Sequence, residues 1–445
     1  MSILNVNKIN PVGGGSTITI AGIASVTNNI SVGNSDTAGS FVGPIEGAVT
    51  GNVTGNVTGN SDTASGLSGN PSINTTGIIT ATTLNYTGNQ NFSHRNLVIN
   101  GNMKIAQRAT TSTTSGYGDL DRWQHEYAST DENPTFAQVS LATSDTPYTL
   151  GLTKTAKITN GNQTSGLQSS SQINFNQNME AQDIRNSGWN YKSSSSYITL
   201  SFWVRASVSQ NYHGFVKTGD GSMYSYSYET GTLSANTWTK ITKAIPGNSN
   251  LQIDDDTGNG FQIFPIAIYG TGFTDNSISN DAWKSWSSGT RTKDQTATWY
   301  TTNDATLEIT GVQLEVGPVA TPFEHRSFGD ELRRCQRYYV TFGNGYNTGA
   351  RGGSGGSLAL YNYHLPVPLR ASPTLLPNDG SLSGFSNRAY KYNGLSDSTN
   401  TPSLATNGFT QNCSFVYVQQ TGHSIDDDRV SAIQQSGGIA LSAEL

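Results

Sequence analysis

Residues 47–60 read GAVTGNVTGNVTGN, and this four-residue repeat constrains what the first part of the chain can fold into. Its period excludes collagen, which needs Gly at every third position. As an extended strand, the repeat places one set of residues on a single face: Gly51, Val53, Gly55, Val57 and Gly59. One Val in every four residues buries too little apolar surface to offset the ordering entropy of a lone strand. We therefore expect identical chains to share this face as the axis of a fibre; the alternative is a flexible Gly/Asn/Thr linker.

The sequence around the repeat is also poor in charged residues and internally repetitive. Residues 1–93 contain four charged side chains, and the hexapeptide GNSDTA occurs twice, at Gly33 and at Gly59. Internal similarity of this kind is typical of an elongated architecture, so we expect a fibrous β shaft over residues 26–95. Residues 1–25 begin with an apolar plug that either docks into another protein or simply starts the shaft: Ile3, Leu4, Val6 and Ile9.

Composition excludes several functional classes. Only 13% of the residues are charged, yet the chain has 20 Tyr, 15 Phe and 7 Trp, which argues against general disorder. A net charge of -6 gives no support to binding nucleic acid or an anionic membrane. No apolar run approaches the roughly twenty residues that span a bilayer, and no Sec-type signal is visible, so we expect synthesis in a cytosol. The two cysteines do not make a disulfide framework.

The middle of the chain predicts a β-sandwich over residues 96–325. In YITLSFWVRASV the apolar residues alternate, and the side predicted to be buried carries Ile198, Leu200, Phe202, Val204, Ala206 and Val208. In TLEITGVQLEV the apolar register shifts at Gly311, which predicts a β-bulge there. FQIFPIAIYG is typical of a strand buried on both faces and interrupted at Pro265.

A short helix and a second β-rich region follow, over residues 326–445. SFGDELRRCQRYY predicts a helix that Ser327 caps, with acidic residues in its first turn. Cys335 falls on the apolar side of this helix and is predicted to pack. CSFVYVQQ is the clearest strand of the last hundred residues, which we expect to form a C-terminal tip domain.

Several segments resemble the signature segments of phage tail-fibre proteins. They are NLVINGNMKIAQR from Asn96, DRW from Asp121, SFWVRAS from Ser201 and GVQLEVGPVATPFEHRSFGDELRRCQRYY from Gly311. The opening MSILNVNKINPVGG and the GNVTGN repeats are similar to fibres of cyanobacterial and marine phages. SFWVRAS and TWTKIT around Trp238 also resemble carbohydrate-binding jelly-roll modules, a fold that structural connectors share.

The resemblance implies an all-β virion protein without enzymatic activity or a cofactor. Its implied architecture is an N-terminal trimeric fibrous shaft, a central jelly roll, a short helix and a β-rich tip. The implied partners are two further copies of the chain, a phage tail or baseplate protein at the N-terminus and a host cell-surface glycan at the C-terminal modules. The alternatives are an adaptor or collar fibre that only joins virion parts, and a tailspike-like polysaccharide depolymerase, for whose β-helix the chain has no room.

Carboxylate and histidine patterns give no strong chemical signal. Asp254–Asp256 and Asp426–Asp428 lack the alternating spacing of a calcium loop, so polar turns are the simpler interpretation and no metal is expected. Glu308 and Glu315 are carboxylates near a predicted strand pair, but nothing marks either one for glycoside hydrolysis. The six His lack metal-ligand spacing, and His325 is predicted to form a hydrogen bond at the junction between sandwich and helix.

Aromatic residues are the candidate ligand contacts, because flat apolar rings stack on sugar rings. The candidates form three pairs close in sequence: Trp283 with Trp286, Tyr361 with Tyr363, and Tyr390 with Tyr392. The alternative for each pair is packing in the core or between subunits.

Overall fold

The structure, a computed structural model, describes residues 94–343 without a gap and shorter stretches on either side. The shorter stretches are 33–34, 37–38, 345–347, 351–352, 358–377, 386–391, 394–398, 403–404, 415–421, 430–436 and 439–445. The chain divides into two compact units, residues 1–82 and 83–445. In the first unit, β1 (Gly33–Asn34) pairs antiparallel with β2 (Thr37–Ala38), within the first GNSDTA repeat.

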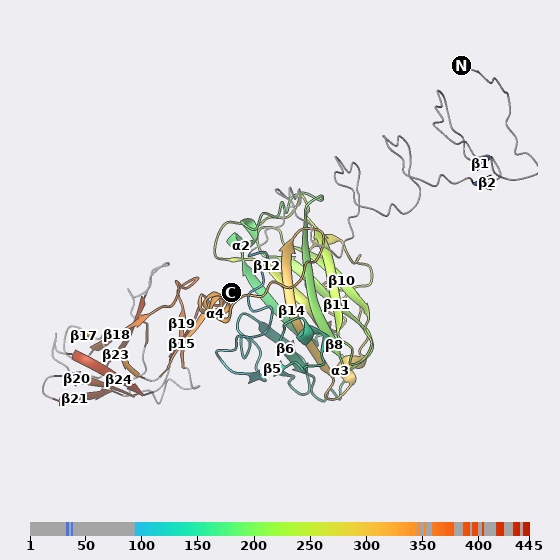
Figure 1. Ribbon diagram of the computed structural model, residues 1–445. Helices are drawn as coiled ribbons and strands as arrows, with labels where there is room; N and C mark the ends of the chain where they lie inside the picture. The colour runs from blue at the N-terminus through green and yellow to red at the C-terminus, as the bar shows by residue number, and fades with distance from the viewer. Residues whose placement is uncertain are drawn as a thin grey trace, which may run out of the picture. The chain divides into compact units, whose positions relative to one another are not determined.

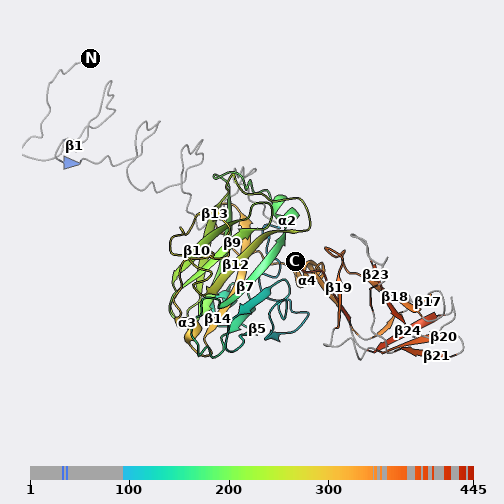
Figure 2. The same cartoon turned by 180° about the vertical axis from the view of Figure 1, so that it is seen from behind.

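Two antiparallel sheets form a sandwich in the second unit, and Figures 1 and 2 show its two sides. The first sheet, in spatial order, contains β13 (Trp283–Ser285), β10 (Tyr224–Thr232), β9 (Asn211–Thr218), β12 (Asn259–Tyr269), β7 (Gln172–Glu180) and β4 (Gln124–Ala128). The second contains β11 (Thr239–Pro246), β8 (Tyr197–Ala206), β14 (Thr306–Val316), β6 (Lys154–Thr159), β5 (Thr135–Ser140) and β3 (Thr111–Ser112). The chain crosses repeatedly between the sheets, as from β7 to β8 and from β8 to β9. This is jelly-roll connectivity.

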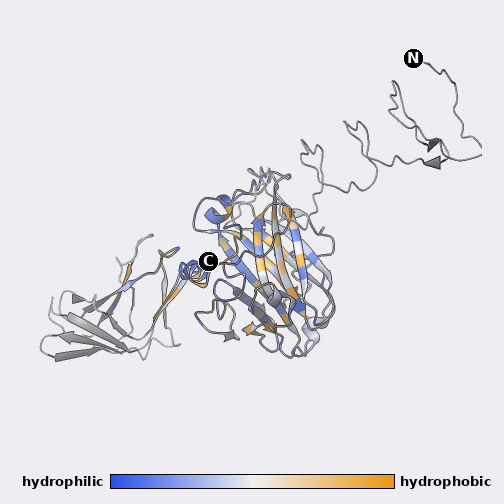
Figure 3. Cartoon of the chain, viewed as in Figure 1, coloured by the Kyte–Doolittle hydropathy of each residue, from blue (hydrophilic) through white to orange (hydrophobic). Residues whose placement is uncertain are grey.

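The apolar core lies between the two sheets, and Figure 3 shows hydrophobic and hydrophilic residues alternating along the strands. In β8 the five predicted core residues from Ile198 to Ala206 are buried. Val208 lies beyond the end of β8 and is partly buried against the core. The opposite side of β8 differs from the expectation of a solvent-facing surface, because Thr199 and Ser201 are buried as well. The Thr199 hydroxyl donates to Gly317 O (2.6 Å), so the segment after β14 covers this part of the sheet.

Two predicted strand irregularities are confirmed. The pairing of β14 with β8 shifts register between Thr310 and Gln313, and Gly311 has φ +62°. The extra residue keeps the apolar side chains on both sides of the bulge directed into the core. In β12 the pairing with β7 shifts between Ile263 and Ile266, on either side of Pro265. The core side chains Ile263 and Ile266 therefore flank the irregularity.

Short helices occupy connections between strands: α1 (Thr146–Thr149), α2 (Ala181–Arg185), α3 (Thr298–Thr301) and α4 (Phe328–Gln336). The predicted α4 is confirmed, and the Ser327 hydroxyl accepts a hydrogen bond from Asp330 N (3.1 Å) as its N-cap. Cys335 is buried against Ile99 and Tyr338, as expected of a packed residue. Within the described residues, none of the helices has the length and apolarity needed to cross a bilayer.

The described part of the C-terminal region consists of strands in three small antiparallel sheets. They are β15 (Tyr339–Phe342) with β25 (Ile439–Ser442) and β19 (Thr374–Pro377); β16 (Gly345–Asn347) with β24 (Val430–Ser436), β20 (Ser386–Lys391) and β21 (Gly394–Ser398); and β17 (Arg351–Gly352) with β18 (Leu358–His364), β23 (Phe415–Thr421) and β22 (Ser403–Leu404). The all-β fold is confirmed, and β23 is the strand that CSFVYVQQ predicts. The proposed domain boundaries stay predictions.

The signature segments meet at a buried polar junction where the chain enters the sandwich. Asn96 Oδ1 accepts hydrogen bonds from Val98 N (3.0 Å) and Leu314 N (3.1 Å), and Asn96 Nδ2 donates to Val312 O (3.2 Å). Glu324 Oε2 accepts a hydrogen bond from Asn96 N (2.9 Å). NLVIN and the FEHRS segment are therefore tied to β14, although more than two hundred residues separate them in the sequence.

Arg326 completes this junction and connects it to α4. Its guanidinium donates to the carbonyl oxygens of Val98 (3.1 Å) and Asn96, and it pairs with Glu324 (3.2 Å) and Glu331 (3.4 Å). Burial of these charged groups is tolerated because each carboxylate has a cationic partner and hydrogen bonds.

A second buried polar cluster holds residues 439–445 against the sandwich. Arg122, from DRW, pairs with Glu444, donates to Asn178 O (2.5 Å) and lies over the Tyr338 ring, with the guanidinium carbon 3.4 Å from the ring centroid. Arg370 donates to the carbonyl oxygens of Ala443 (2.8 Å) and Glu444 (2.9 Å). The C-terminal strand β25 is therefore fixed at its end by charge-assisted hydrogen bonds.

Phe202→Ala is expected to destabilise the sandwich strongly. Phe202 is 0% exposed within the core cluster, and large-to-small substitutions at such positions cost about 3–5 kcal/mol. Urea unfolding followed by tryptophan fluorescence measures this cost. Tyr148→Ala is the control, because Tyr148 is 37% exposed and surface substitutions usually change stability by less than about 0.5 kcal/mol. Equal stability of the two variants would contradict the assignment of the core.

Asp121, the first residue of DRW, gives a pH-dependent prediction. Burial raises the pKa of this carboxyl from 3.8 to about 6, against the opposing charge of Arg108 and the hydrogen bonds from Gln107. The folded state therefore binds a proton more tightly than the unfolded chain. Asp121 contributes most to stability below about pH 4, and this contribution is lost as the pH rises to about 6.

Replacing Asp121 by Asn removes that titration. We expect the stability of the native protein, relative to Asp121→Asn, to fall between pH 4 and pH 7 by on the order of 3 kcal/mol. Denaturant midpoints of both proteins across this range measure the change, and any constant offset from altered hydrogen bonds cancels. A difference that does not vary with pH would show that Asp121 is ionised throughout.

Candidate functional site

An aromatic cluster that is separate from the sandwich core lies on the outer face of the first sheet. Phe215 of β9 stacks on Phe264 of β12, with ring centroids 4.1 Å apart and planes 11° apart. Tyr269 and Ala267 are buried beside them, and Phe273 and Trp286 are partly buried at the margin. Of the residues in this outer aromatic patch, Trp286 alone is a ligand contact predicted from the sequence.

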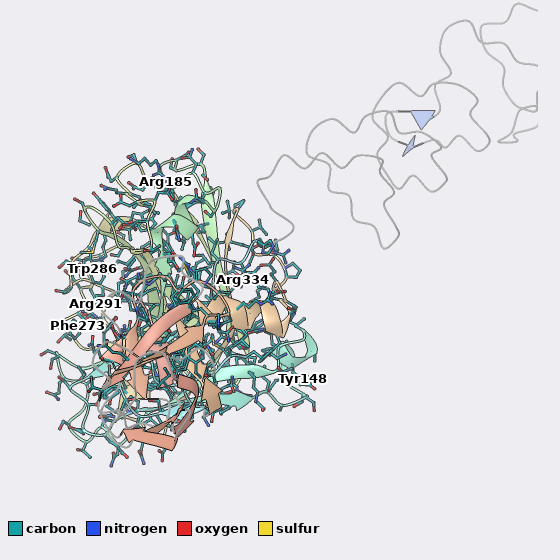
Figure 4. The ribbon with its side chains drawn as sticks, turned by 90° about the vertical axis from the view of Figure 1, so that its left-hand side faces the viewer. Tyr148, Arg185, Phe273, Trp286, Arg291 and Arg334 are labelled. Carbon is teal, nitrogen blue, oxygen red and sulfur yellow. The ribbon has the colours of Figure 1, made fainter. Side chains whose placement is uncertain are left out.

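The irregularity at Pro265 places this cluster. On the far side of the register shift, Ile266 and Ile268 face the core, whereas Ala267 and Tyr269 face outward. The connection after β12 then folds back over the patch, and Arg291 N donates to Phe273 O (2.8 Å). Figure 4 shows Phe273, Trp286 and Arg291 on one side of the molecule, while Tyr148 and Arg334 lie elsewhere.

Trp286 rests on side chains that rise from β9. The Phe215 ring lies 5.7 Å from the Trp286 ring, with 23° between the planes, and Lys217 Nζ lies 4.5 Å from the Trp286 centroid. Phe215 and Lys217 are two residues apart on the same face of β9, so both contact the indole from the side of the sheet. The backbone N of Trp286 donates to Met223 O (2.9 Å), which fixes the position of the ring at the edge of the sheet.

Arg291 lies among the rings at the margin of the patch. Its guanidinium carbon is 4.4 Å from the centroid of Phe273, 4.9 Å from that of Tyr269 and 5.7 Å from that of Trp286. Nη1 donates to Gln172 Oε1 (3.1 Å) and Nε donates to Ser288 O (3.2 Å). Cation–π contacts of this kind hold the guanidinium in one orientation next to Trp286.

Amide side chains lie next to the patch on the same side of the first sheet, on β7, β4 and β12. Asn178 Oδ1 accepts from Gln262 Nε2 (2.6 Å), and Asn178 Nδ2 donates to Gln124 Oε1 (3.3 Å). The Oδ1 atoms of Asn174 and Asn176 are buried and lack a hydrogen-bond partner in the described part of the chain. An unmatched buried acceptor is costly, and with Asn174 0% and Asn176 1% exposed these two oxygens lie beneath the surface of the sheet.

Cations lie around the patch with lowered proton affinity. Burial lowers the pKa of Lys217, and the nearby Arg291 lowers it further, while Glu126 acts in the opposite direction. Burial also lowers the pKa of Lys284 to about 8. The Lys284 ammonium donates to Ser225 Oγ (3.0 Å) and to Thr290 O.

The structure separates Trp283 from Trp286. Trp283 belongs to β13, packs against the sandwich core beside Tyr226 (5.5 Å between ring centroids) and donates from Nε1 to Pro246 O (2.6 Å). Trp286 follows the end of β13 and joins the outer cluster. The two rings therefore belong to different clusters.

Three of the four predicted tyrosine contacts lie in described C-terminal strands. Tyr363 of β18 is 7% exposed, with its ring 4.9 Å from that of Phe342, which is the arrangement expected of the packing alternative. Tyr361 pairs with Val418 in the backbone register, and Tyr390 belongs to β20. Tyr392 lies outside the described residues. Ligand contact by these tyrosines stays a prediction.

The predicted residues of the leader also lie outside the described part of the chain. These are the docking residues Ile3, Leu4, Val6 and Ile9 and the axis residues Gly51, Val53, Gly55, Val57 and Gly59.

The two glutamates considered for catalysis are engaged in internal contacts. Glu308 forms a bidentate pair with Arg205 (2.9 and 3.1 Å). Glu315 accepts hydrogen bonds from Thr321 N (2.8 Å) and Gln313 Nε2 (2.8 Å). These contacts hold β8 against β14 and fix the segment after β14.

Other candidates from the sequence have local structural contacts. His325 Nε2 lies 2.9 Å from Leu150 O, which confirms the expected hydrogen bond at the junction. Asp256 Oδ1 accepts a hydrogen bond from Gly258 N (2.8 Å), as in a polar turn. No group of three or more His, Cys, Asp or Glu in the described residues is arranged to hold a metal ion. Asp426–Asp428 lie outside these residues.

Three cavities open on other parts of the described residues. One of about 480 Å³ lies near Arg334 and Asp183, one of about 590 Å³ lies beside α4 near Arg333 and Pro368, and one of about 530 Å³ lies between Trp203 and Phe323. None of these three cavities includes the outer aromatic patch, which is a surface platform.

Comparison with known proteins gives structural likenesses only. No known family profile matches the chain, and no curated protein matches it in sequence. The similar structures include the enzymatically active domain of tailspike protein 4 of bacteriophage CBA120 (10% identity, 50% of this chain, 21% of that chain, TM-score 0.26). They also include the family 11 carbohydrate-binding module of Clostridium thermocellum (9%, 46%, 95%, 0.21) and the CBM22-1–CBM22-2 tandem of Paenibacillus barcinonensis Xyn10C (8%, 72%, 93%, 0.22). The match thus spans about a fifth of the tailspike domain. At these TM-scores the likenesses carry no argument about this chain.

Proposed function

We propose that this chain is a phage fibre protein that attaches to a host-surface glycan, and that the outer aromatic patch binds the saccharide. The observation that carries the binding site is Trp286, a partly exposed indole supported by Phe215 and Lys217 on the outer face of a sheet. An indole face offers a flat apolar surface to the C–H face of a sugar ring. The fibre role is supported by the resemblance of the signature segments.

Binding without hydrolysis is the form of this function that the geometry supports best. Glycoside hydrolysis requires two carboxyl groups on either side of the scissile bond. Glu308 and Glu315 are held by Arg205, Thr321 and Gln313. Incubation with saccharides that the protein binds, followed by measurement of chain length, distinguishes the two functions, since shortened chains would establish a depolymerase.

The shaft is proposed to make the protein a homotrimer in the virion, with the N-terminus docked to a tail or baseplate protein. The support is the Gly/Val face of residues 51–59, which is too thin to be stable in a single chain. The adaptor or collar role is the alternative, and particles that adsorb normally without this protein would favour it.

Light scattering tests the oligomeric state. We expect the native protein to have the mass of three chains. Val53→Asp combined with Val57→Asp should dissociate it, because the packed axis would bury carboxylates without partners. Val53→Ala with Val57→Ala is the uncharged control, with a smaller expected loss. A native protein that is monomeric at micromolar concentration would refute the trimer.

Trp286→Ala should weaken saccharide binding at least tenfold, corresponding to about 1.4 kcal/mol, because the stacking surface is lost. The measurement is binding of the full-length protein to immobilised saccharides, paired with a thermal melt. Tyr148→Ala removes an exposed aromatic ring that Figure 4 shows outside the patch. It should leave binding unchanged. If Trp286→Ala binds as well as the native protein while its melt is unaltered, the binding site lies elsewhere.

A further inference from the structure

The outer aromatic patch carries cations that lack acidic partners, unlike four arginines elsewhere in the second unit. Arg122, Arg205, Arg326 and Arg337 each pair with a carboxylate at 3.4 Å or closer. In the described part of the chain, no carboxylate oxygen lies within 4.0 Å of Lys217 or Arg291, or of Lys284. Within the described residues, these four arginines are thus paired with carboxylates, whereas the cations beside Trp286 are not.

The acidic residues around the patch are engaged in local contacts. Asp294 accepts from Thr274 Oγ1 (2.6 Å) and Asn276 Nδ2 (2.7 Å). Glu229 accepts from Asn211 Nδ2 (2.7 Å). Neither carboxylate forms an ion pair with Lys217, Lys284 or Arg291.

Two more carboxylates face the same region. Asp275 accepts from Ser277 N (2.7 Å) and acts on Lys284, whose pKa it raises against the effect of burial. Glu126, on β4, raises the pKa of Lys217 but lies too far away for an ion pair. Lys217 thus has one acidic neighbour and no acidic contact.

Partial burial makes this lack of partners costly. Lys217 loses hydration beside Trp286 and faces the like charge of Arg291. An anionic group of a ligand would give these cations the charged partner that they lack. Hydrogen bonds between charged groups are roughly twice as strong as those between neutral groups. The guanidinium of Arg291 also offers the fork that matches carboxylate, sulfate and phosphate oxygens.

We infer that the saccharide bound on this face is acidic, with a uronate, sulfate or phosphate group held by Lys217 and Arg291 while its ring stacks on Trp286. Lys217 Nζ lies 4.5 Å and the Arg291 guanidinium carbon 5.7 Å from the Trp286 centroid. Both cations therefore lie beside the indole on which we place the sugar ring. This inference rests on the proposed function of the patch and adds the class of ligand.

The experiment uses the full-length protein on an array of saccharides that carries neutral chains, uronates, sulfate esters and phosphate esters. The inference expects acidic saccharides to be bound in preference to neutral saccharides of the same backbone. Polygalacturonate and its methyl ester are one such pair, and dextran sulfate and dextran are another. Bound signal should fall steeply between 50 mM and 500 mM salt, because charge pairs at a partly exposed site are screened.

Variants of Lys217 separate this inference from the proposed function. Lys217→Gln should reduce binding of the acidic saccharides at least tenfold, and Lys217→Arg should retain most of it, because the positive charge is kept. Lys192→Gln is the matched control, because Lys192 is an exposed lysine that is not part of the patch. Its binding should equal that of the native protein.

The outcomes are distinct. If neutral saccharides bind as well as acidic ones, or if Lys217→Gln retains acidic binding, the inference is overturned, while loss of binding in Trp286→Ala would still support the proposed function. If no saccharide on the array binds, or if Trp286→Ala leaves all binding intact, the proposed function fails and the inference with it. Thermal melts of each variant exclude unfolding as the cause of a loss.

Discussion

The buried polar junction at Asn96 is the interaction on which the architecture of the second unit depends. The segment from Arg95 to Gly101 enters the sandwich without belonging to a strand, so its backbone groups need partners from side chains. Asn96, Glu324 and Arg326 supply them, and in doing so they connect the start of the sandwich, β14 and α4. The long block of signature sequence from Gly311 to Tyr339 is explained by this requirement. Residues of this block form hydrogen bonds with the segment that begins at Arg95, about two hundred residues earlier in the sequence.

The position of the outer aromatic patch follows from the core in a similar way. β12 must keep Ile263, Ile266 and Ile268 in the core across an interruption at Pro265. The register shift that achieves this leaves Phe264 and Tyr269 on the outer face, next to Phe215. The connection from Gly270 to Arg291 then covers part of these rings and brings Phe273, Trp286 and Arg291 beside them. The register shift that keeps the apolar residues of β12 in the core therefore also creates the candidate site on the outer face.

Local features were predictable from the sequence wherever one residue determines the backbone. Gly311 marked a bulge because a register shift in the apolar pattern needs an extra residue, and Ser327 marked the start of α4 because its hydroxyl can cap the first turn. The candidate site was not predictable in this way. Trp283 and Trp286 are three residues apart, yet the end of β13 falls between them, so one joins the core and the other the outer patch. The pairing of β9 with β12 and the loop that returns over them bring together Phe215, Lys217, Tyr269 and Arg291. The hydrophobic periodicity of a sequence carries no information on such pairing or on the path of a loop. The alternation of apolar and polar residues also predicted that the polar face of β8 would be exposed. That face is buried because Gly317, from a distant part of the chain, covers Thr199.

The charge distribution bears on the selectivity inferred for the proposed site. A chain with 13% charged residues and a net charge of -6 exerts little long-range attraction on an acidic surface. Recognition of an acidic saccharide would then depend on contact pairing at Lys217 and Arg291 rather than on steering from a distance. Contact pairing of this kind is weak at a single partly exposed site. If three chains associate as proposed, the same weak site is presented three times on one fibre, and effective concentration raises the overall affinity without any new contact. On the proposed function, a weak but charge-selective site would therefore be sufficient for attachment. It would also leave each contact reversible, so that a particle could exchange contacts on a surface while remaining bound.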